Sequence, residues 1–183
     1  LLEIGSSLSK AGVVWGDVKP GNIVSFKEVV TIRYKAIDFD SSRRDGGAGA
    51  TLHGPTFISN EFLAGDSTTM VTPGYVSPER ATAIQNKRNI TADSRQDVFV
   101  MGLIIYQLFA KKPYFTPKQI ENESYLQILI SDDFKANLEA IKHKNVKKFL
   151  QEMLARQPSS RNKFDQILKK NIFNASSSIS TSN

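Results

Sequence analysis

Apolar residues recur at helical spacing through the second half of the chain. Residues 98–109 form the longest apolar run, which is too short to span a bilayer and predicts a buried core helix over 94–109. Ser94, three residues before Asp97, is a possible capping box at the start of this helix. Two later stretches repeat the helical spacing and predict amphipathic helices. Their apolar positions are Val146, Phe149, Leu150, Met153 and Leu154 in one and Phe164, Ile167 and Leu168 in the other.

The first part of the chain mixes one helical stretch with short apolar runs. Residues 1–12 carry apolar positions at helical spacing and close on glycine, a common helix stop. Runs rich in β-branched residues predict small strands at 13–14, 23–26, 29–32 and 34–37. The stretch from Asp40 to Met70 is rich in Ser, Gly, Arg and Thr and predicts a long loop. The expected fold class is mainly α with a few short β-strands.

Composition narrows the classes of function. The 183 residues include no cysteine, which excludes a disulfide framework and a thiolate zinc site and favours a cytoplasmic location. The formal net charge of +6 comes with lysines gathered at 142–148 and 163–170, which fit solvated helix faces. There is no continuous basic stripe with interleaved aromatic residues, so no nucleic-acid partner is expected. No signal peptide or membrane-spanning segment is visible in the sequence, so no membrane partner is expected.

Polar residues gather between the predicted strands. Asp17, Lys19 and Asn22 fall in one tight loop, and Asp38 follows the next strand. Two carboxylates, an amide and an ammonium group are therefore expected at one end of a small hairpin. Phosphoryl transfer uses such a set, because it needs oxygen ligands for Mg²⁺, a carboxylate that accepts the proton of the attacking hydroxyl, and a cation for the developing phosphate charge.

Five motifs, in order along nearly the whole chain, resemble those of eukaryotic-type protein kinases. Residues 17–22 (Asp-x-Lys-x-x-Asn) resemble the catalytic loop, and residues 38–40 (Asp-Phe-Asp) resemble the metal-binding Asp-Phe-Gly. Residues 72–79 resemble the end of the activation segment. Residues 97–102 resemble the start of the central helix, and residues 157–161 resemble the arginine-bearing turn near the end of the fold.

The resemblance implies a role for each residue of the polar cluster. Asp17 would be the catalytic base, and Lys19 would contact the γ-phosphate of ATP. Asn22 and Asp38 would hold Mg²⁺, so that the cofactors would be ATP and magnesium and the partner a protein substrate. Lys19, together with Thr72, points to serine or threonine rather than tyrosine as the acceptor.

The resemblance also implies supporting roles. The activation segment would span 38–79, within a kinase lobe covering 1–173 that is followed by a disordered Ser-rich tail over 174–183. Glu79 and Arg161 match the buried ion pair of the family. Asp97 matches the residue that anchors the backbone of the catalytic loop.

Three positions depart from the usual pattern. Trp15 and Gly16 stand where most of the family has His-Arg, and Asp40 replaces a glycine. An arginine before the catalytic aspartate can pair with a phosphate on the activation loop. Gly16 has no such side chain, so catalytic competence is expected to depend little on phosphorylation of the loop acceptors at 67–69.

The chain is expected to be a C-terminal lobe without the N-terminal β-rich lobe. Nothing in it resembles the glycine-rich loop or the lysine-bearing strand that cover ATP in this family, so the chain alone is expected to be catalytically incomplete. Two alternatives stay open. One is a small-molecule kinase of the aminoglycoside or choline type, whose loops also tend to read Gly-Asp-x-x-Pro-x-Asn, and the other is a non-catalytic pseudokinase. Residues 72–79 and 97–102, with Arg161, favour the protein kinase.

Overall fold

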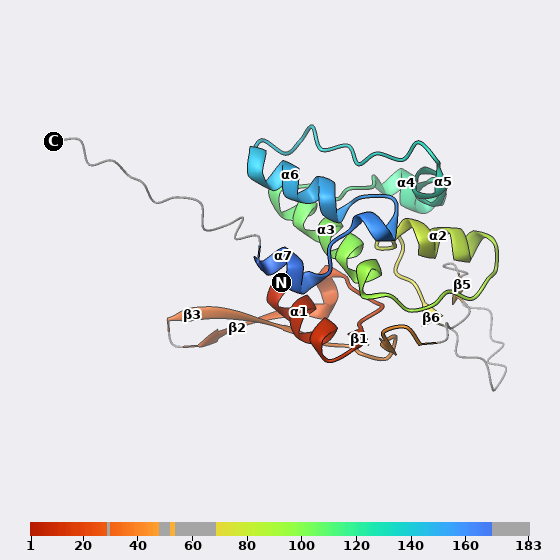
Figure 1. Cartoon of the computed structure of the whole chain (residues 1–183). Coiled ribbons are helices and arrows are strands. Elements are labelled where there is room, and N and C mark those ends of the chain that lie inside the picture. The colour runs from red at the N-terminus through yellow and green to blue at the C-terminus, as the bar shows by residue number, and fades with distance from the viewer. Residues whose placement is uncertain (29, 48–51, 54–68, 170–183) are drawn as a thin grey trace.

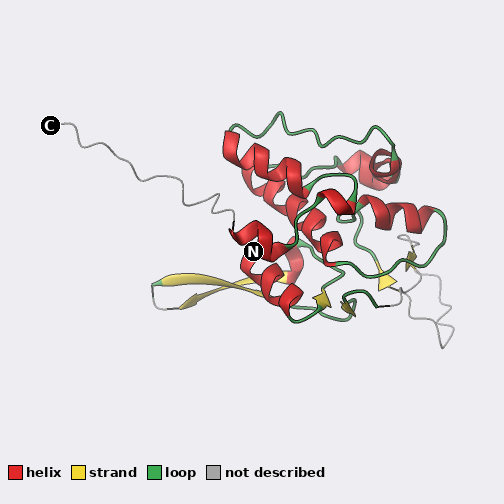
Figure 2. Cartoon of the chain, viewed as in Figure 1, coloured by secondary structure: helices red, strands yellow, loops and turns green. Residues whose placement is uncertain are grey.

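Helices make up most of the chain in the computed structural model, and short strands lie along one side of them (Figure 2). The structure describes residues 1–28, 30–47, 52–53 and 69–169, so the predicted tail and the loop acceptors Ser67 and Thr68 lie outside it. The helices are α1 (Leu2–Lys10), α2 (Pro78–Gln85), α3 (Ser94–Ala110), α4 (Pro117–Glu121), α5 (Ser124–Ile130), α6 (Lys144–Met153) and α7 (Phe164–Lys169), with 3₁₀ turns η1 (Pro20–Asn22) and η2 (Pro158–Ser160). The strands are β1 (Val13–Val14), β2 (Ile23–Glu28), β3 (Thr31–Ala36), β4 (Arg43–Arg44), β5 (Leu52–His53) and β6 (Thr69–Met70).

Helix α3 forms the centre of the hydrophobic core. It is buried on nearly all sides, as expected for a helix whose apolar residues are not confined to one stripe. It packs against α6 and α1, while α2 packs against α5 and α1 against α7 (Figure 1). At Gly102 the approach is so close that a Cβ would lie 2.9 Å from Leu154 Cδ2, so a larger residue here would force Leu154, at the end of α6, to shift.

The predicted helices agree with the structure except at two places. Helix α6 buries Val146, Phe149, Leu150 and Met153, as predicted. Leu168 of α7, predicted to face the core, is 37% exposed. The predicted cap of α3 is wrong by one residue: the carboxylate of Asp93 accepts the N–H of Arg95 at 2.8 Å, and the Ser94 hydroxyl has no partner in the described part of the chain.

The described strands form three separate pairs, two antiparallel and one parallel. β2 and β3 make an antiparallel ribbon, with Ile23 opposite Ala36, that projects from the helical body (Figure 1). The runs at 29–32 and 34–37, predicted as two strands, contribute to the single strand β3. β1 pairs with β4 antiparallel, and β5 pairs with β6 in parallel. The last three strands lie in the stretch predicted as loop, because two-residue strands are too short to show any periodicity.

The polar loop lies between the helical body and the β2–β3 ribbon. The loop from 15 to 22 follows β1, lies beside the first turn of α3, and leads directly into the β2–β3 ribbon. The ribbon returns the chain to Asp38, next to the same loop. Within the part of the chain that is described, no helix combines the length and apolar character needed to cross a membrane.

Candidate active site

The carboxylate of Asp17 is the centre of the candidate site. Its Oδ2 accepts from Lys19 Nζ at 2.6 Å and from Asn22 Nδ2 at 3.0 Å. Its Oδ1 accepts from Thr72 Oγ1 at 2.7 Å, and Lys19 Nζ donates to Thr72 Oγ1 at 3.2 Å. The structure thus brings together the three polar residues predicted in this loop, and Thr72 joins them from the far end of the activation segment.

A short 3₁₀ turn closes the loop. Pro20 begins η1, where its fixed φ suits the first helical position. Asn22 at the end of the turn is buried, and its Nδ2 donates to the backbone oxygen of Asp17 at 2.9 Å. The backbone oxygen of Asn22 accepts the N–H of Ile37 at 2.9 Å. These two bonds hold Asp17 in place and connect its loop to the segment that carries Asp38.

Asp38 lies just after β3 in a left-handed backbone conformation with φ of 61°. Its backbone oxygen accepts the indole N–H of Trp15 at 2.9 Å. The ring of the next residue, Phe39, stacks on Trp15 with 5.9 Å between centroids. A left-handed non-glycine residue costs free energy and persists where its surroundings fix it, so Trp15 holds Asp38 in this conformation.

Asn22 and Asp38 are the residues that could hold Mg²⁺. Nδ2 of Asn22 is used by Asp17, which leaves the amide oxygen for a metal. The Asp38 side chain is exposed and has no hydrogen bond or ion pair to any described residue. Within the described ranges, no three acidic or histidine side chains lie close enough to bind a metal by themselves. A pair of oxygen donors fits Mg²⁺, which usually binds one or two protein groups together with water and substrate phosphates.

The peptide groups just before Asp17 are held by the buried carboxylate of Asp97. Oδ2 of Asp97 accepts the N–H of Trp15 at 2.6 Å, and Oδ1 accepts the N–H of Gly16 at 3.1 Å. Burial raises the pKa of Asp97 to about 6, while the two N–H donors and the positive charge of Arg80 act in the opposite direction. Asp97 therefore anchors the loop from below, as the resemblance implies.

This carboxyl makes stability depend on pH. The pKa of Asp97 is about 6 in the folded chain against 3.8 ordinarily, so between these values the folded state binds the proton more readily than the unfolded state. Its contribution should therefore stabilise the fold as the pH falls through this window, by up to about 1.4 kcal/mol per pH unit. The measurement is the free energy of unfolding in urea, for the unmodified and the Asp97→Asn proteins, across this window. As the pH falls, this free energy should rise for the unmodified protein relative to Asp97→Asn. A constant difference would contradict it.

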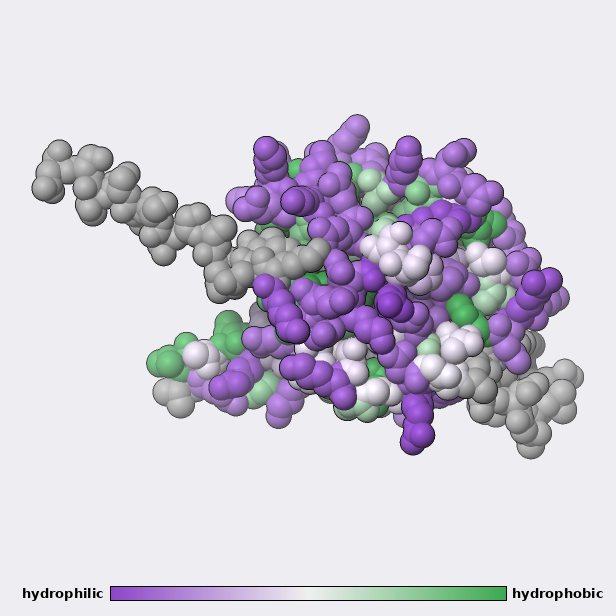
Figure 3. Space-filling view, viewed as in Figure 1, coloured by the Kyte–Doolittle hydropathy of each residue, from purple (hydrophilic) through white to green (hydrophobic). Residues whose placement is uncertain are grey.

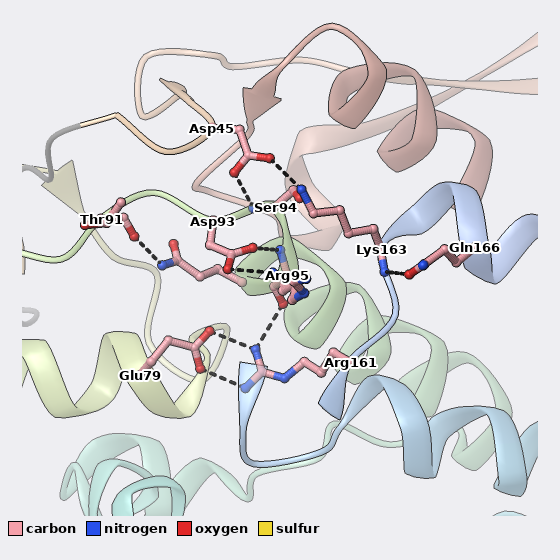
Figure 4. A network of polar contacts seen from close by, with 10 residues as sticks. Asp45, Glu79, Thr91, Asp93, Ser94, Arg95, Arg161, Lys163 and Gln166 are labelled. Carbon is pink, nitrogen blue, oxygen red and sulfur yellow. Dashed lines mark hydrogen bonds and ion pairs between the residues drawn. The ribbon is translucent and has the colours of Figure 1, made fainter. Parts of the chain in front are cut away.

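Glu79 and Arg161 form the predicted ion pair (Figure 4). The two guanidinium nitrogens of Arg161 lie 2.8 and 2.7 Å from the two carboxylate oxygens of Glu79, and the Arg161 side chain is fully buried. Arg161 also donates to the backbone oxygens of Ala155, Arg95 and Arg156. The pair thus joins the start of α2 to η2 and to the first turn of α3.

Sequence reasoning missed Arg80. This residue follows Glu79 in α2, is 4% exposed, and its Nη1 donates to the backbone oxygen of Gly16. The one signal in the sequence is its place directly after Glu79, in the motif that resembles the end of the activation segment, and this place does not say where the side chain points.

A family model described as the protein kinase domain matches residues 6–173. The chain therefore belongs to the protein kinase domain family. The resemblance to eukaryotic-type Ser/Thr kinases is confirmed, and so is the mainly helical fold with few short strands.

Curated relatives support the same family. The chain is 29% identical over 169 residues to "Serine/threonine-protein kinase PKH1" of Saccharomyces cerevisiae, which covers 91% of this chain and 20% of the relative. It is 27% identical over 155 residues to "Probable serine/threonine-protein kinase PknB" of Corynebacterium glutamicum, which covers 82% of this chain and 21% of the relative. A protein of the same name from Bifidobacterium longum is 29% identical over 107 residues, 58% of this chain and 13% of the relative. The chain thus spans about a fifth or less of these relatives.

Proposed function

We propose that this chain carries the catalytic loop and the metal-binding segment of a protein kinase that phosphorylates serine or threonine. The observation that carries the proposal is the cluster around Asp17, whose carboxylate is held by Lys19, Asn22 and Thr72. The cluster contains a fixed carboxylate and a cation, and Asp38 supplies a second carboxylate next to the same loop. The family supports the transfer of a phosphate from ATP with Mg²⁺ to other proteins.

The residues act through position and charge. When bound, ATP with Mg²⁺ would supply the electrophilic γ-phosphoryl group, and ADP would be the leaving group. Asp17, whose two oxygens are fixed by three donors, orients the acceptor hydroxyl and takes its proton. Lys19, 2.6 Å from this carboxylate, adds positive charge where the phosphate charge develops. Asn22 and Asp38 would hold the metal through their side-chain oxygens.

The test uses a protein that carries an ATP-covering N-terminal lobe ahead of Leu1, called here the two-lobed protein. We expect Mg²⁺-dependent transfer from ATP to Ser/Thr peptides, and little transfer to Tyr peptides, kanamycin or choline. Transfer to kanamycin or choline alone would favour a small-molecule kinase, and no transfer with intact folding would favour a pseudokinase. We also propose that residues 1–183 alone transfer phosphate poorly, because positioning of ATP supplies much of the catalysis in this chemistry.

Asp38→Asn in the two-lobed protein should raise the Mg²⁺ concentration needed for half-maximal rate by about tenfold or more, because it removes a charged hard ligand. Asparagine also tolerates the left-handed backbone at this position, so the change leaves the loop conformation intact. The measurement is the rate against Mg²⁺ concentration at saturating ATP. Asp133→Asn, an exposed carboxylate far along the chain from this motif, is the matched control. An unchanged Mg²⁺ requirement for Asp38→Asn would count against the metal assignment.

A further inference from the structure

Gly16, the residue before Asp17, has no side chain of its own, yet a guanidinium group lies against it. Nη1 of Arg80, which comes from the first turn of α2, donates to the backbone oxygen of Gly16. Arg80 is 64 residues away in sequence and is 4% exposed. Burying the charge of an arginine costs free energy unless nearby groups compensate it.

The backbone explains why position 16 cannot carry the cation. Gly16 has φ of 83°, in the left-handed region that glycine adopts freely. A Cβ built on Gly16 would overlap the backbone oxygen of Ser41. The segment after the metal-binding motif thus approaches the catalytic loop too closely for any side chain at this position, and a cation has to come from another element.

The charges around Arg80 favour its ionised form. Burial lowers the pKa of Arg80, while Asp97, Asp17 and Glu79 raise it and Arg43 lowers it further. Arginine keeps its charge in proteins, and three acidic neighbours compensate it here. Gly16 is therefore held at both of its polar groups: Asp97 accepts from its N–H, and Arg80 donates to its oxygen.

We propose that Arg80 is a positioning residue for Asp17, and that it replaces, from α2, the guanidinium that position 16 lacks. The inference rests on the proposed function, since it concerns the same catalytic loop. Helix α2 is itself anchored through the neighbouring Glu79 to Arg161, so its cation is fixed to the core of the fold. The catalytic loop is then set by side chains of the fold, and its geometry needs no phosphate on the activation segment.

The first experiment measures kcat and KM of the two-lobed protein for the unmodified chain, Arg80→Met and Arg80→Lys. Methionine keeps an unbranched apolar stem but removes the donor and the charge, so kcat should fall by about tenfold or more while both KM values change by less than about twofold. Lysine restores a donor and the charge and should recover most of kcat. Arg88→Met, at the exposed position just after α2, is the matched control and should match the unmodified protein.

Arg80→Gln keeps a neutral amide NH₂ group on a shorter side chain and replaces Arg80→Met if the latter does not fold. The proposal is overturned if the methionine or glutamine variant keeps kcat within about twofold, or if lysine recovers stability but none of kcat. Phosphatase treatment of the unmodified protein is the second test. It should leave kcat within about twofold, and a loss of about tenfold or more would overturn the proposal.

A third measurement does not depend on activity. Trp15 is the one tryptophan of the chain, is 1% exposed, and precedes Gly16 directly. Loss of the Arg80 contact should therefore shift its emission to longer wavelength and increase its quenching by acrylamide, with no such change in Arg88→Met. If the unmodified protein transfers no phosphate, the proposed function fails but this readout still decides whether Arg80 positions the loop. Unchanged emission in every Arg80 variant would overturn the positioning role.

Discussion

Asp17→Asn in the two-lobed protein is expected to lower kcat by about 10²- to 10⁴-fold, the usual range for removing a positioned acid or base. The carboxylate accepts from Lys19, Asn22 and Thr72, and none of these donors can take up a proton in its place. The amide of asparagine can keep part of this network but cannot act as the base. KM for ATP should change little, because Asp17 is placed to act on the acceptor hydroxyl.

The measurement is steady-state turnover with a Ser/Thr peptide over a range of ATP concentrations. Asp133→Asn, an exposed carboxylate outside the cluster, is the matched control and should leave kcat unchanged. A value of kcat for Asp17→Asn within about threefold of the unmodified protein would show that Asp17 is not the base.

Breaking the ion pair between Glu79 and Arg161 should destabilise the fold by about 3 to 5 kcal/mol, because each single change leaves the other charge, fully buried for Arg161 and 18% exposed for Glu79, without its partner. Arg161→Met should have the larger effect, since it also leaves three backbone oxygens without their donor. Glu79→Gln keeps the shape of the side chain and removes only its charge.

Urea unfolding of both single variants and of the double variant separates these contributions. The exposed pair of Arg33 and Glu28, with a similar separation of 2.6 Å, provides the control. Arg33→Met should cost less than about 1 kcal/mol, because the pair is open to solvent. Equal effects at the buried and the exposed pair would contradict the argument from burial.

The local parts of the site could be predicted from sequence because they depend on neighbouring residues. Asp17, Lys19 and Asn22 lie within six positions, and a turn that starts at Pro20 closes them into one loop. The central helix was predicted from its apolar run, which needs no knowledge of its partners. The pair of Glu79 and Arg161 came from the family resemblance, since nothing local relates residues 82 positions apart.

The parts that could not be predicted depend on how distant segments meet. The hydroxyl of Thr72 reaches Asp17 across 55 residues, and Arg80 reaches Gly16 across 64. No periodicity or spacing encodes such contacts. The misplaced cap of α3 has a different cause: the carboxylate of Asp93, one residue before Ser94, accepts the N–H of Arg95, while Asp97 holds the catalytic loop, as the resemblance implied.

The β2–β3 ribbon has a consequence for how the molecule behaves at high concentration. The ribbon is two-stranded, so both outer edges carry backbone groups that no other described strand pairs. Val30, Ile32 and Tyr34 are 89%, 66% and 52% exposed, and Figure 3 shows apolar surface at the projecting end. Unpaired strand edges beside exposed apolar side chains favour strand addition between copies. We therefore expect that any protein surface that covers the ribbon also prevents self-association of the chain.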